Sequence, residues 1–126
     1  MQKRSKKFQN KITKNDFDEE IEKINENKII LVEGNKDKIA LKKFGIKNKI
    51  IILNKPLFKI VENIAENTKQ VILLTDLDSE GKKLYSKIKK DLQKFGVKID
   101  DKFREFLFKT NLRQIEGMKK YYDKLD

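Results

Sequence analysis

The chain has 126 residues, with 31 Lys and Arg against 20 Asp and Glu, and its formal net charge is +11. That length suits one domain with a single core, and the excess of cations favours a polyanionic partner, RNA or DNA. The sequence has no Cys and no His, which excludes thiolate nucleophiles, zinc fingers, disulfides and imidazole catalysis. It also has no apolar run near the about 18 residues of a membrane span and no apolar signal region, so we expect a cytoplasmic protein without membrane contact.

Residues 1–27 are predicted to form a basic arm followed by a short helix. Six Lys or Arg fall within residues 2–14, with little periodicity. Asn15 or Asp16 is the expected helix cap, and apolar residues then follow at helical spacing from Phe17. We expect this helix to pack on the domain that follows.

Four short segments predict the strands of one buried sheet: residues 28–32, 49–53, 70–74 and, as a shorter edge strand, 97–100. Helical patterns separate them, which gives the order β-α-β-α-β-α-β. Because crossovers between parallel strands are right-handed, this order predicts a four-stranded parallel sheet with helices on both faces. The fold class is α/β, with the domain over residues 28–100.

Two of the connecting helices are predicted to end at glycines. Gly45 and Gly96 each follow a Phe and precede an apolar residue. A glycine in the left-handed conformation there lets the next residue fold back on the helix, as in a Schellman ending.

Residues 101–126 are predicted to form a C-terminal helical extension. Phe108, Leu112, Ile115, Met118 and Tyr122 fall on one helical stripe. The aromatic residues at 103, 106 and 108 suit core packing, with stacking on unpaired bases as the alternative. The extension is also a possible docking element for a larger complex.

Acidic residues follow two of the predicted strands directly. Glu33 and Gly34 come after the first strand, and Asp76 and Asp78 come after the third. Alternate residues of an extended backbone point the same way, and all C-terminal ends of a parallel sheet share one edge. If the two strands are neighbours, the three carboxylates converge there.

Such a cluster calls for a cation. Two charges about 4 Å apart repel by roughly 4 kcal/mol at an effective dielectric near 20. Oxygen ligands without nitrogen or sulfur select a hard ion, so we expect one or two Mg²⁺ ions, with Mn²⁺ as a substitute.

Each acid also has an ordinary structural explanation. Glu33 and Gly34 can form a simple turn, Asp78 or Ser79 can cap the next helix, and Glu80 can complement its dipole.

Three other acidic motifs fit less well. An EF-hand loop starting at Asp76 would need a Glu at its twelfth position, where this chain has Lys87. A haloacid-dehalogenase-type phosphatase places Asp-x-Asp after its first strand, and a receiver domain needs a fifth strand for which the chain is too short.

The segment from about Lys28 to Asp100 resembles the Toprim domain shared by type IA and type II topoisomerases, bacterial primases, OLD-family nucleases, RecR proteins and a ribonuclease that matures ribosomal RNA. An apolar strand ending in Glu33-Gly34 and a later one ending in Asp76-x-Asp78 carry the resemblance. It implies a Toprim (Rossmann-like) fold and a Mg²⁺-dependent site that makes or breaks phosphodiester bonds.

The resemblance also implies residue roles. Glu33 corresponds to the general acid or base, which can also touch a metal, and Asp76 and Asp78 correspond to the pair that holds Mg²⁺. Glu80 stands where topoisomerases often carry a third acid. The chain lacks the gate domain of topoisomerases and the zinc module of primases, so it is most similar to the ribosomal-RNA-processing ribonucleases and small archaeal Toprim proteins.

Phosphate contacts are expected around these acids. Backbone amides after Gly34 and Gly81 lie at predicted helix N-termini, and Lys82 follows the Asp motif; as an alternative, Lys82 is an ordinary exposed helix residue. Arg104 and Arg113 can give bidentate phosphate contacts.

Three function classes stay open. The first is a Mg²⁺-dependent nuclease or nucleotidyl transferase acting on RNA or DNA. The second is a non-catalytic, Mg²⁺-dependent nucleic-acid-binding module, and the third is a subunit of an RNA- or DNA-processing complex. An enzyme is favoured, because a pure binding module has no need of Glu33.

Overall fold

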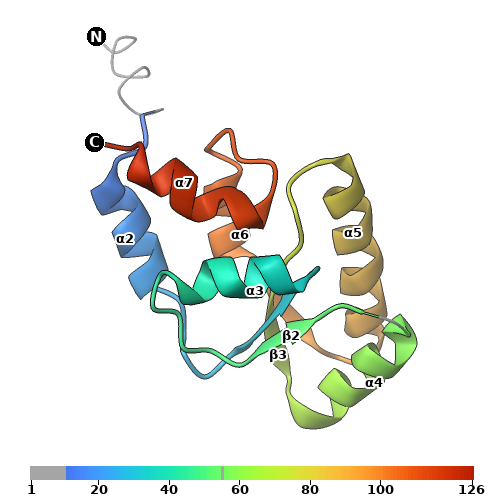
Figure 1. Cartoon of the computed structure of the whole chain (residues 1–126). Helices are drawn as coiled ribbons and strands as arrows, with labels where there is room; N and C mark the ends of the chain where they lie inside the picture. The colour runs from blue at the N-terminus through green and yellow to red at the C-terminus, as the bar shows by residue number, and fades with distance from the viewer. Residues whose placement is uncertain (1–10, 55) are drawn as a thin grey trace, which may run out of the picture.

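The computed structural model describes residues 11–54 and 56–126, and it confirms the predicted α/β fold with one four-stranded parallel sheet (Figure 1). The strands are β1 (Ile29–Val32), β2 (Ile50–Ile52), β3 (Gln70–Leu74) and β4 (Lys98–Asp100), in the spatial order β2-β1-β3-β4. Each lies within a predicted strand segment, and β4 is an edge strand as expected. Most of the predicted basic arm falls on residues 1–10, outside the described residues.

The register of the sheet brings the ends of β1 and β3 level with each other. These strands are direct neighbours, and Val32 pairs with Leu74 at the last rung of the ladder. Glu33 and Thr75 are therefore the first residues beyond the same edge of the sheet. This register places the two acidic turns side by side.

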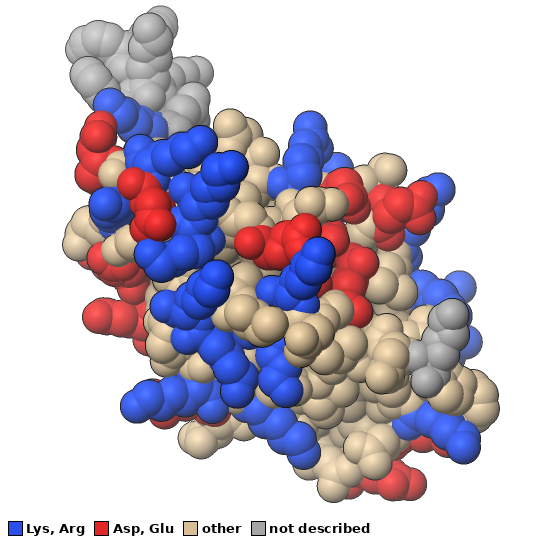
Figure 2. Space-filling model, in the orientation of Figure 1, with Lys and Arg blue, Asp and Glu red and all other residues tan. Residues whose placement is uncertain are grey.

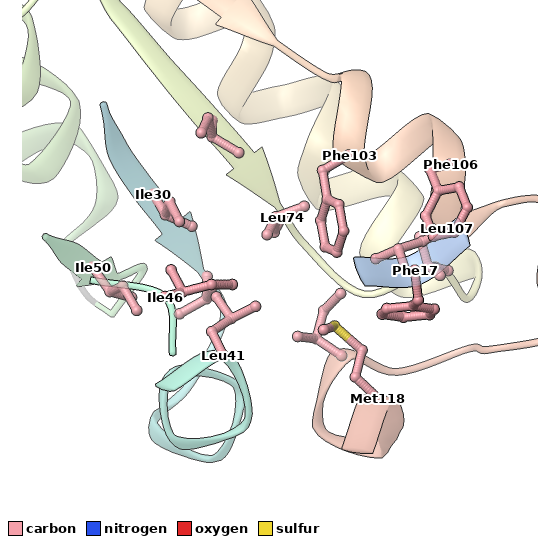
Figure 3. Close-up of a cluster of buried hydrophobic side chains, with 14 residues drawn as sticks. Phe17, Ile30, Leu41, Ile46, Ile50, Leu74, Phe103, Phe106, Leu107 and Met118 are labelled. Carbon is pink, nitrogen blue, oxygen red and sulfur yellow. The ribbon is translucent and has the colours of Figure 1, made fainter. Parts of the chain in front are cut away.

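Helices cover both faces of the sheet. The elements are α2 (Lys14–Glu22), α3 (Asn35–Lys42), α4 (Leu57–Asn67), α5 (Ser79–Lys94), α6 (Lys102–Leu107), the 3-10 turn η1 (Ile115–Gly117) and α7 (Met118–Asp123). The core on one face combines Ile30, Val32, Ile72 and Leu74 with residues of α2, α3, α6, η1 and α7, and Figure 3 shows part of it. The intervening strand residues, such as Leu31 and Leu73, pack against α4 and α5 on the other face. Successive side chains of a strand point to opposite sides of the sheet. Because helices cover both sides, consecutive strand residues are all buried.

The N-terminal helix α2 is part of this core. Phe17 is fully buried, and its ring centroid lies 5.3 Å from that of Phe106 and 5.7 Å from those of Phe44 and Tyr122. The expected cap was wrong by two or three residues. Thr13 caps the helix, since its hydroxyl accepts from Asp16 N–H while the Asp16 carboxylate accepts from Thr13 N–H.

The C-terminal extension is not the single helix that its apolar stripe predicts. Helix α6 ends at Leu107, and the chain runs irregularly to η1. Thr110 interrupts the helix, because its hydroxyl donates to Leu107 C=O and accepts from Leu112 N–H. Phe108 is consequently 38% exposed, whereas Ile115 is fully buried.

Helix α7 uses its apolar residues inside the protein. Met118 is fully buried, and Tyr121 and Tyr122 pack against the same core. This packing gives no support to the idea that the extension presents an apolar face to a partner protein. None of the helices in the described residues has the length and hydropathy that crossing a membrane requires.

The two predicted glycine endings are present. Gly45 and Gly96 have φ angles of 78° and 79°. At Gly96 the Val97 N–H also donates to Leu92 C=O at 3.1 Å, which completes a Schellman ending.

Candidate metal centre

The site begins with one contact between the two acidic turns. Oε2 of Glu33 accepts a hydrogen bond from the backbone N–H of Asp76 at 2.8 Å. Glu33 directly follows β1 and Asp76 lies two residues beyond β3, so the pairing of these strands sets this contact. The Glu33 side chain therefore points toward the turn that carries Asp76 and Asp78.

Asp76 is held through three of its polar groups. Its N–H donates to Glu33, its C=O accepts from Nη2 of Arg104 at 2.9 Å, and its Oδ1 accepts from Ile115 N–H at 2.9 Å. These contacts come from Glu33 after β1, from α6 and from η1. The Asp76 carboxylate consequently has a defined direction.

Asp78 caps helix α5, as the structural alternative predicted. Its Oδ1 accepts from Gly81 N–H at 2.8 Å. Gly81 is buried against the backbone of Asp76, and Thr75, also buried, donates its hydroxyl to Gly81 C=O at 2.7 Å. The capping bond uses one carboxylate oxygen only, so it does not exclude a second role for Asp78.

The three carboxylates share one arrangement. Each accepts one backbone N–H through one oxygen, and within residues 11–54 and 56–126 no protein donor reaches Oε1 of Glu33 or Oδ2 of Asp76 and Asp78. Oxygen atoms with free lone pairs are suitable ligands for a hard cation. The donor set therefore fits Mg²⁺.

The fit is that of an open site. Among the described residues, no three acidic side chains form a ready-made metal cage, so the expected convergence of three carboxylates on one ion is not preformed. Mg²⁺ commonly uses one or two carboxylates and completes its shell with water and substrate phosphates. An open edge of this kind suits such a mode of binding.

Burial and mutual repulsion perturb the acids. Burial raises the pKa of Glu33 above its usual value, and the charges of Asp76 and Asp78 raise it further. The hydrogen bond from Asp76 N–H lowers the pKa but does not cancel these effects. Burial also raises the pKa of Asp76, with further contributions from Asp78 and Glu116. A nearby cation would relieve this repulsion.

Two further acids belong to this edge, and the sequence analysis missed both. Asp37 is only 6% exposed, and burial together with the Asp76 charge raises its pKa to about 6. It caps α3 by accepting from Gly34 N–H at 3.1 Å, and its place three residues after Gly34 was the available signal. Glu116, in η1, lies near enough for its charge to raise the pKa of both Asp37 and Asp76, which no local pattern indicates.

The predicted phosphate contacts have different environments. Gly34 starts α3, and Lys82 is exposed near the N-terminus of α5, with Nζ 5.5 Å from the ring centroid of Phe108. Arg113 is exposed. Arg104 differs from the expectation, because it is 3% exposed and donates to backbone carbonyls.

Glu80 lies in the first turn of α5 and is exposed. Its position agrees with the helix-dipole alternative. The contacts of the described residues do not connect it to Glu33 or Asp76.

Figure 2 shows the charge distribution around the site. Acidic side chains form a patch near the middle of the displayed face, above the end of α3 that follows β1, and basic side chains gather beside it over α3 and α7. The lysines on these two helices are Lys36, Lys38, Lys42, Lys119 and Lys120. An acidic patch next to a basic surface suits a polyanion that contacts a cation held by the acids.

Comparison with known proteins agrees with this geometry. A Toprim domain matches residues 27–101, more than half of the chain. The chain belongs to the Toprim domain family. Membership in this family indicates divalent-metal binding and a function related to nucleic acids.

Small proteins are similar to this chain over most of its length. A UPF0292 protein of Pyrococcus abyssi is 36% identical over 94 residues, which is 75% of this chain and 71% of the relative. One from Methanocaldococcus jannaschii is 35% identical over 104 residues, or 79% and 81% of the two chains. Among solved structures, a putative protein from Aquifex aeolicus matches with a TM-score of 0.72 and 38% identity, covering 82% of this chain and 95% of that one. The expected similarity to small archaeal Toprim proteins is confirmed.

Proposed function

We propose that this Toprim protein is a Mg²⁺-dependent enzyme that makes or breaks phosphodiester bonds in RNA or DNA. Asp76 and Asp78 would hold Mg²⁺, with Glu33 beside them as the general acid or base. The observation that carries the proposal is the hydrogen bond from Asp76 N–H to Glu33 Oε2. It joins the proton-transfer residue to the metal-holding turn through a single contact.

Mg²⁺ bound at this edge would stabilise the negative charge that develops on a phosphate during transfer. The remaining tasks belong to side chains of the protein. Since Oε2 of Glu33 is engaged with Asp76 N–H, Oε1 is the oxygen free to hold or release a proton. Because the pKa of Glu33 is raised, it lies closer to neutral pH, which suits a group that must both take up and release a proton.

The surrounding lysines would bind the nucleic-acid backbone. Phosphate binding by Lys releases counterions, so affinity should fall steeply with salt. The test is to measure nucleic-acid affinity at about 50 and about 200 mM salt. An affinity that is the same at both would contradict the proposal that the lysines bind the nucleic-acid backbone.

The decisive experiment is Glu33→Gln. Glutamine can still accept from Asp76 N–H but cannot transfer a proton, so we expect nearly unchanged nucleic-acid affinity and loss of Mg²⁺-dependent cleavage or transfer. Glu62→Gln, on the exposed surface of α4 on the other face of the sheet, is the matched control. Full activity of Glu33→Gln would rule out its catalytic role.

A second candidate is a Mg²⁺-dependent binding module without turnover. The open acidic edge would also suit this function, because Mg²⁺ held there could bind a phosphate without any bond being broken. Incubation of the protein with labelled structured RNA and with DNA, each with Mg²⁺ or a chelator, distinguishes the two functions. Chelator-sensitive binding without any product would favour the binding module.

A further inference from the structure

We propose that residues 102–117 are a working part of the metal centre, with Arg104 as the residue that positions Asp76. This segment follows the residues that match the Toprim domain, which end at 101. The inference rests on the proposed function, because it takes Asp76 as a metal-holding residue.

Arg104 bridges two consecutive backbone carbonyls of the metal-holding turn. Its Nη2 donates to Asp76 C=O at 2.9 Å and its Nε donates to Thr75 C=O at 3.4 Å. A planar guanidinium presents several donors in a fixed geometry, which the ammonium of a lysine cannot reproduce. Arg104 therefore fixes the direction of the backbone at the residue that carries the carboxylate.

Two aromatic rings hold the guanidinium in place. Its central carbon lies 4.1 Å from the ring centroid of Tyr85 on α5 and 4.9 Å from that of Phe108. Tyr85 OH in turn lies 3.4 Å from Oδ2 of Asp101, within hydrogen-bonding distance. Cation–π contacts of this kind restrict both the position and the plane of the guanidinium.

The same segment holds the turn at two more points. Ile115 N–H donates to Oδ1 of Asp76 at 2.9 Å, and Arg113 C=O accepts from Leu77 N–H at 2.7 Å. The segment thus contacts the carbonyl and carboxylate of Asp76 and the amide of the next residue. Because Oδ1 of Asp76 accepts from Ile115 N–H, the orientation of the carboxylate is fixed and Oδ2 remains available to a metal ion.

Arg104 is buried without an ion pair to any residue that the structure describes, which packing alone does not explain. It is 3% exposed, and no carboxylate in the described part of the chain lies within ion-pair distance of it. A buried cation whose hydrogen bonds go to carbonyls and not to a carboxylate is costly to retain, even with the charges of Glu33, Glu105 and Asp101 nearby. Orientation of a metal-holding residue gives the protein a reason to retain it, since such outer contacts commonly change metal affinity by about 10- to 100-fold.

The test is Mn²⁺ binding to the full chain without nucleic acid, followed by electron paramagnetic resonance, with Mg²⁺ as competitor. We expect Arg104→Met to weaken Mn²⁺ affinity by about tenfold or more, and Arg104→Lys to weaken it as well. The spectrum of the bound ion should also change, which a loss of stability alone would not produce. Lys109→Met, an exposed substitution just after α6, is the control and should bind Mn²⁺ as the original chain does.

Phe108→Leu keeps the test decisive if Arg104→Met does not fold. Phe108 is 38% exposed, so the variant should remain folded while it loosens one side of the guanidinium stack. Its Mn²⁺ affinity should fall by a few fold, roughly 2- to 5-fold on the scale of such outer contacts. Unchanged affinity and spectrum in folded Arg104→Lys and Phe108→Leu would overturn the inference. Absence of Mn²⁺ binding in the original chain would instead contradict the proposed function itself.

Discussion

Gly81 packs so closely on Asp76 that a methyl group on its α-carbon would overlap the Asp76 carbonyl group. Gly81 lies in the first turn of α5, where Ala would otherwise be the better helix former. We therefore expect Gly81→Ala to destabilise the protein by about 1–3 kcal/mol and to weaken divalent-metal binding. Urea unfolding and metal titration measure the two effects.

Gly34→Ala is the matched control. A methyl group at Gly34 meets no atom within 4 Å, and its φ of −151° is accessible to any residue. The free energy of unfolding should change by no more than about 0.5 kcal/mol. A stabilising effect of Gly81→Ala would contradict the close packing.

The stability of the protein should depend on pH through Asp37. Its pKa is raised to about 6 from an ordinary 3.8, mainly by burial, so its ionisation opposes folding as the pH rises from about 4 to 6. Asp37→Asn removes this penalty while its amide oxygen can still accept from Gly34 N–H. Above pH 6, in chelator, the variant should be more stable by about 2 kcal/mol.

Urea unfolding at several pH values tests this expectation. The difference in free energy of unfolding between Asp37→Asn and the original chain should shrink below pH about 4, where Asp37 is protonated in both the folded and the unfolded protein. Glu66→Gln, on the exposed side of α4, serves as the control. A difference that does not vary with pH would show that ionisation of Asp37 is not its cause.

The partly buried ion pair between Lys28 and Asp100 should stabilise the sheet. Nζ of Lys28 lies 2.8 Å from Oδ2 of Asp100, and their side chains are 19% and 18% exposed. Burial alone would raise the pKa of Asp100, but its hydrogen bonds to Lys28 and to Lys102 N–H lower it overall. Lys28→Met should cost about 1–2 kcal/mol at pH 7.

The sign of the pH effect follows from that lowered pKa. The stabilisation is present above the unfolded pKa of Asp100, near 4, and is lost as the pH falls through the lower folded value. A double-mutant cycle with Asp100→Asn isolates the coupling energy. The exposed pair of Lys23 and Glu20 is the comparison, and Lys23→Met should cost less than about 0.5 kcal/mol.

The N-terminal helix should be essential to folding. Phe17 is fully buried among aromatic residues of α6, α7 and the turn after α3, so Phe17→Ala should destabilise the protein by about 3–5 kcal/mol. Thermal unfolding provides the measurement. Ile39→Ala, at a side chain that is 46% exposed, should change stability by less than about 0.5 kcal/mol. A small effect of Phe17→Ala would mean that α2 is a separable addition.

The sequence was most informative where a residue's role depends on its near neighbours. Apolar runs of four residues indicated β1, β2 and β3, and the alternation of apolar and polar residues over 97–100 indicated β4. A glycine after the last phenylalanine of a helical pattern indicated both left-handed helix ends. Local competition also explains the main error of the prediction. The Thr110 hydroxyl bonds to the backbone of Leu107 and Leu112 and ends the expected C-terminal helix, although the apolar spacing continues through it.

Arg104 illustrates what such patterns cannot indicate. A charged residue is normally exposed, so its type and position suggested a phosphate contact at the surface. In the structure it is buried beneath the Asp76 turn, because Tyr85 and two carbonyl groups from distant parts of the chain surround it.

The amino-acid sequence by itself determined the order of strands and helices and the acids that follow β1 and β3, because both depend on residues close together in the chain. Only the tertiary structure decided that β1 lies beside β3, that Asp37 and Glu116 join Glu33 at one edge, and that the C-terminal segment holds Asp76. Those relationships depend on which distant backbone groups satisfy one another's hydrogen bonds, and hydrophobic periodicity carries no information about that choice.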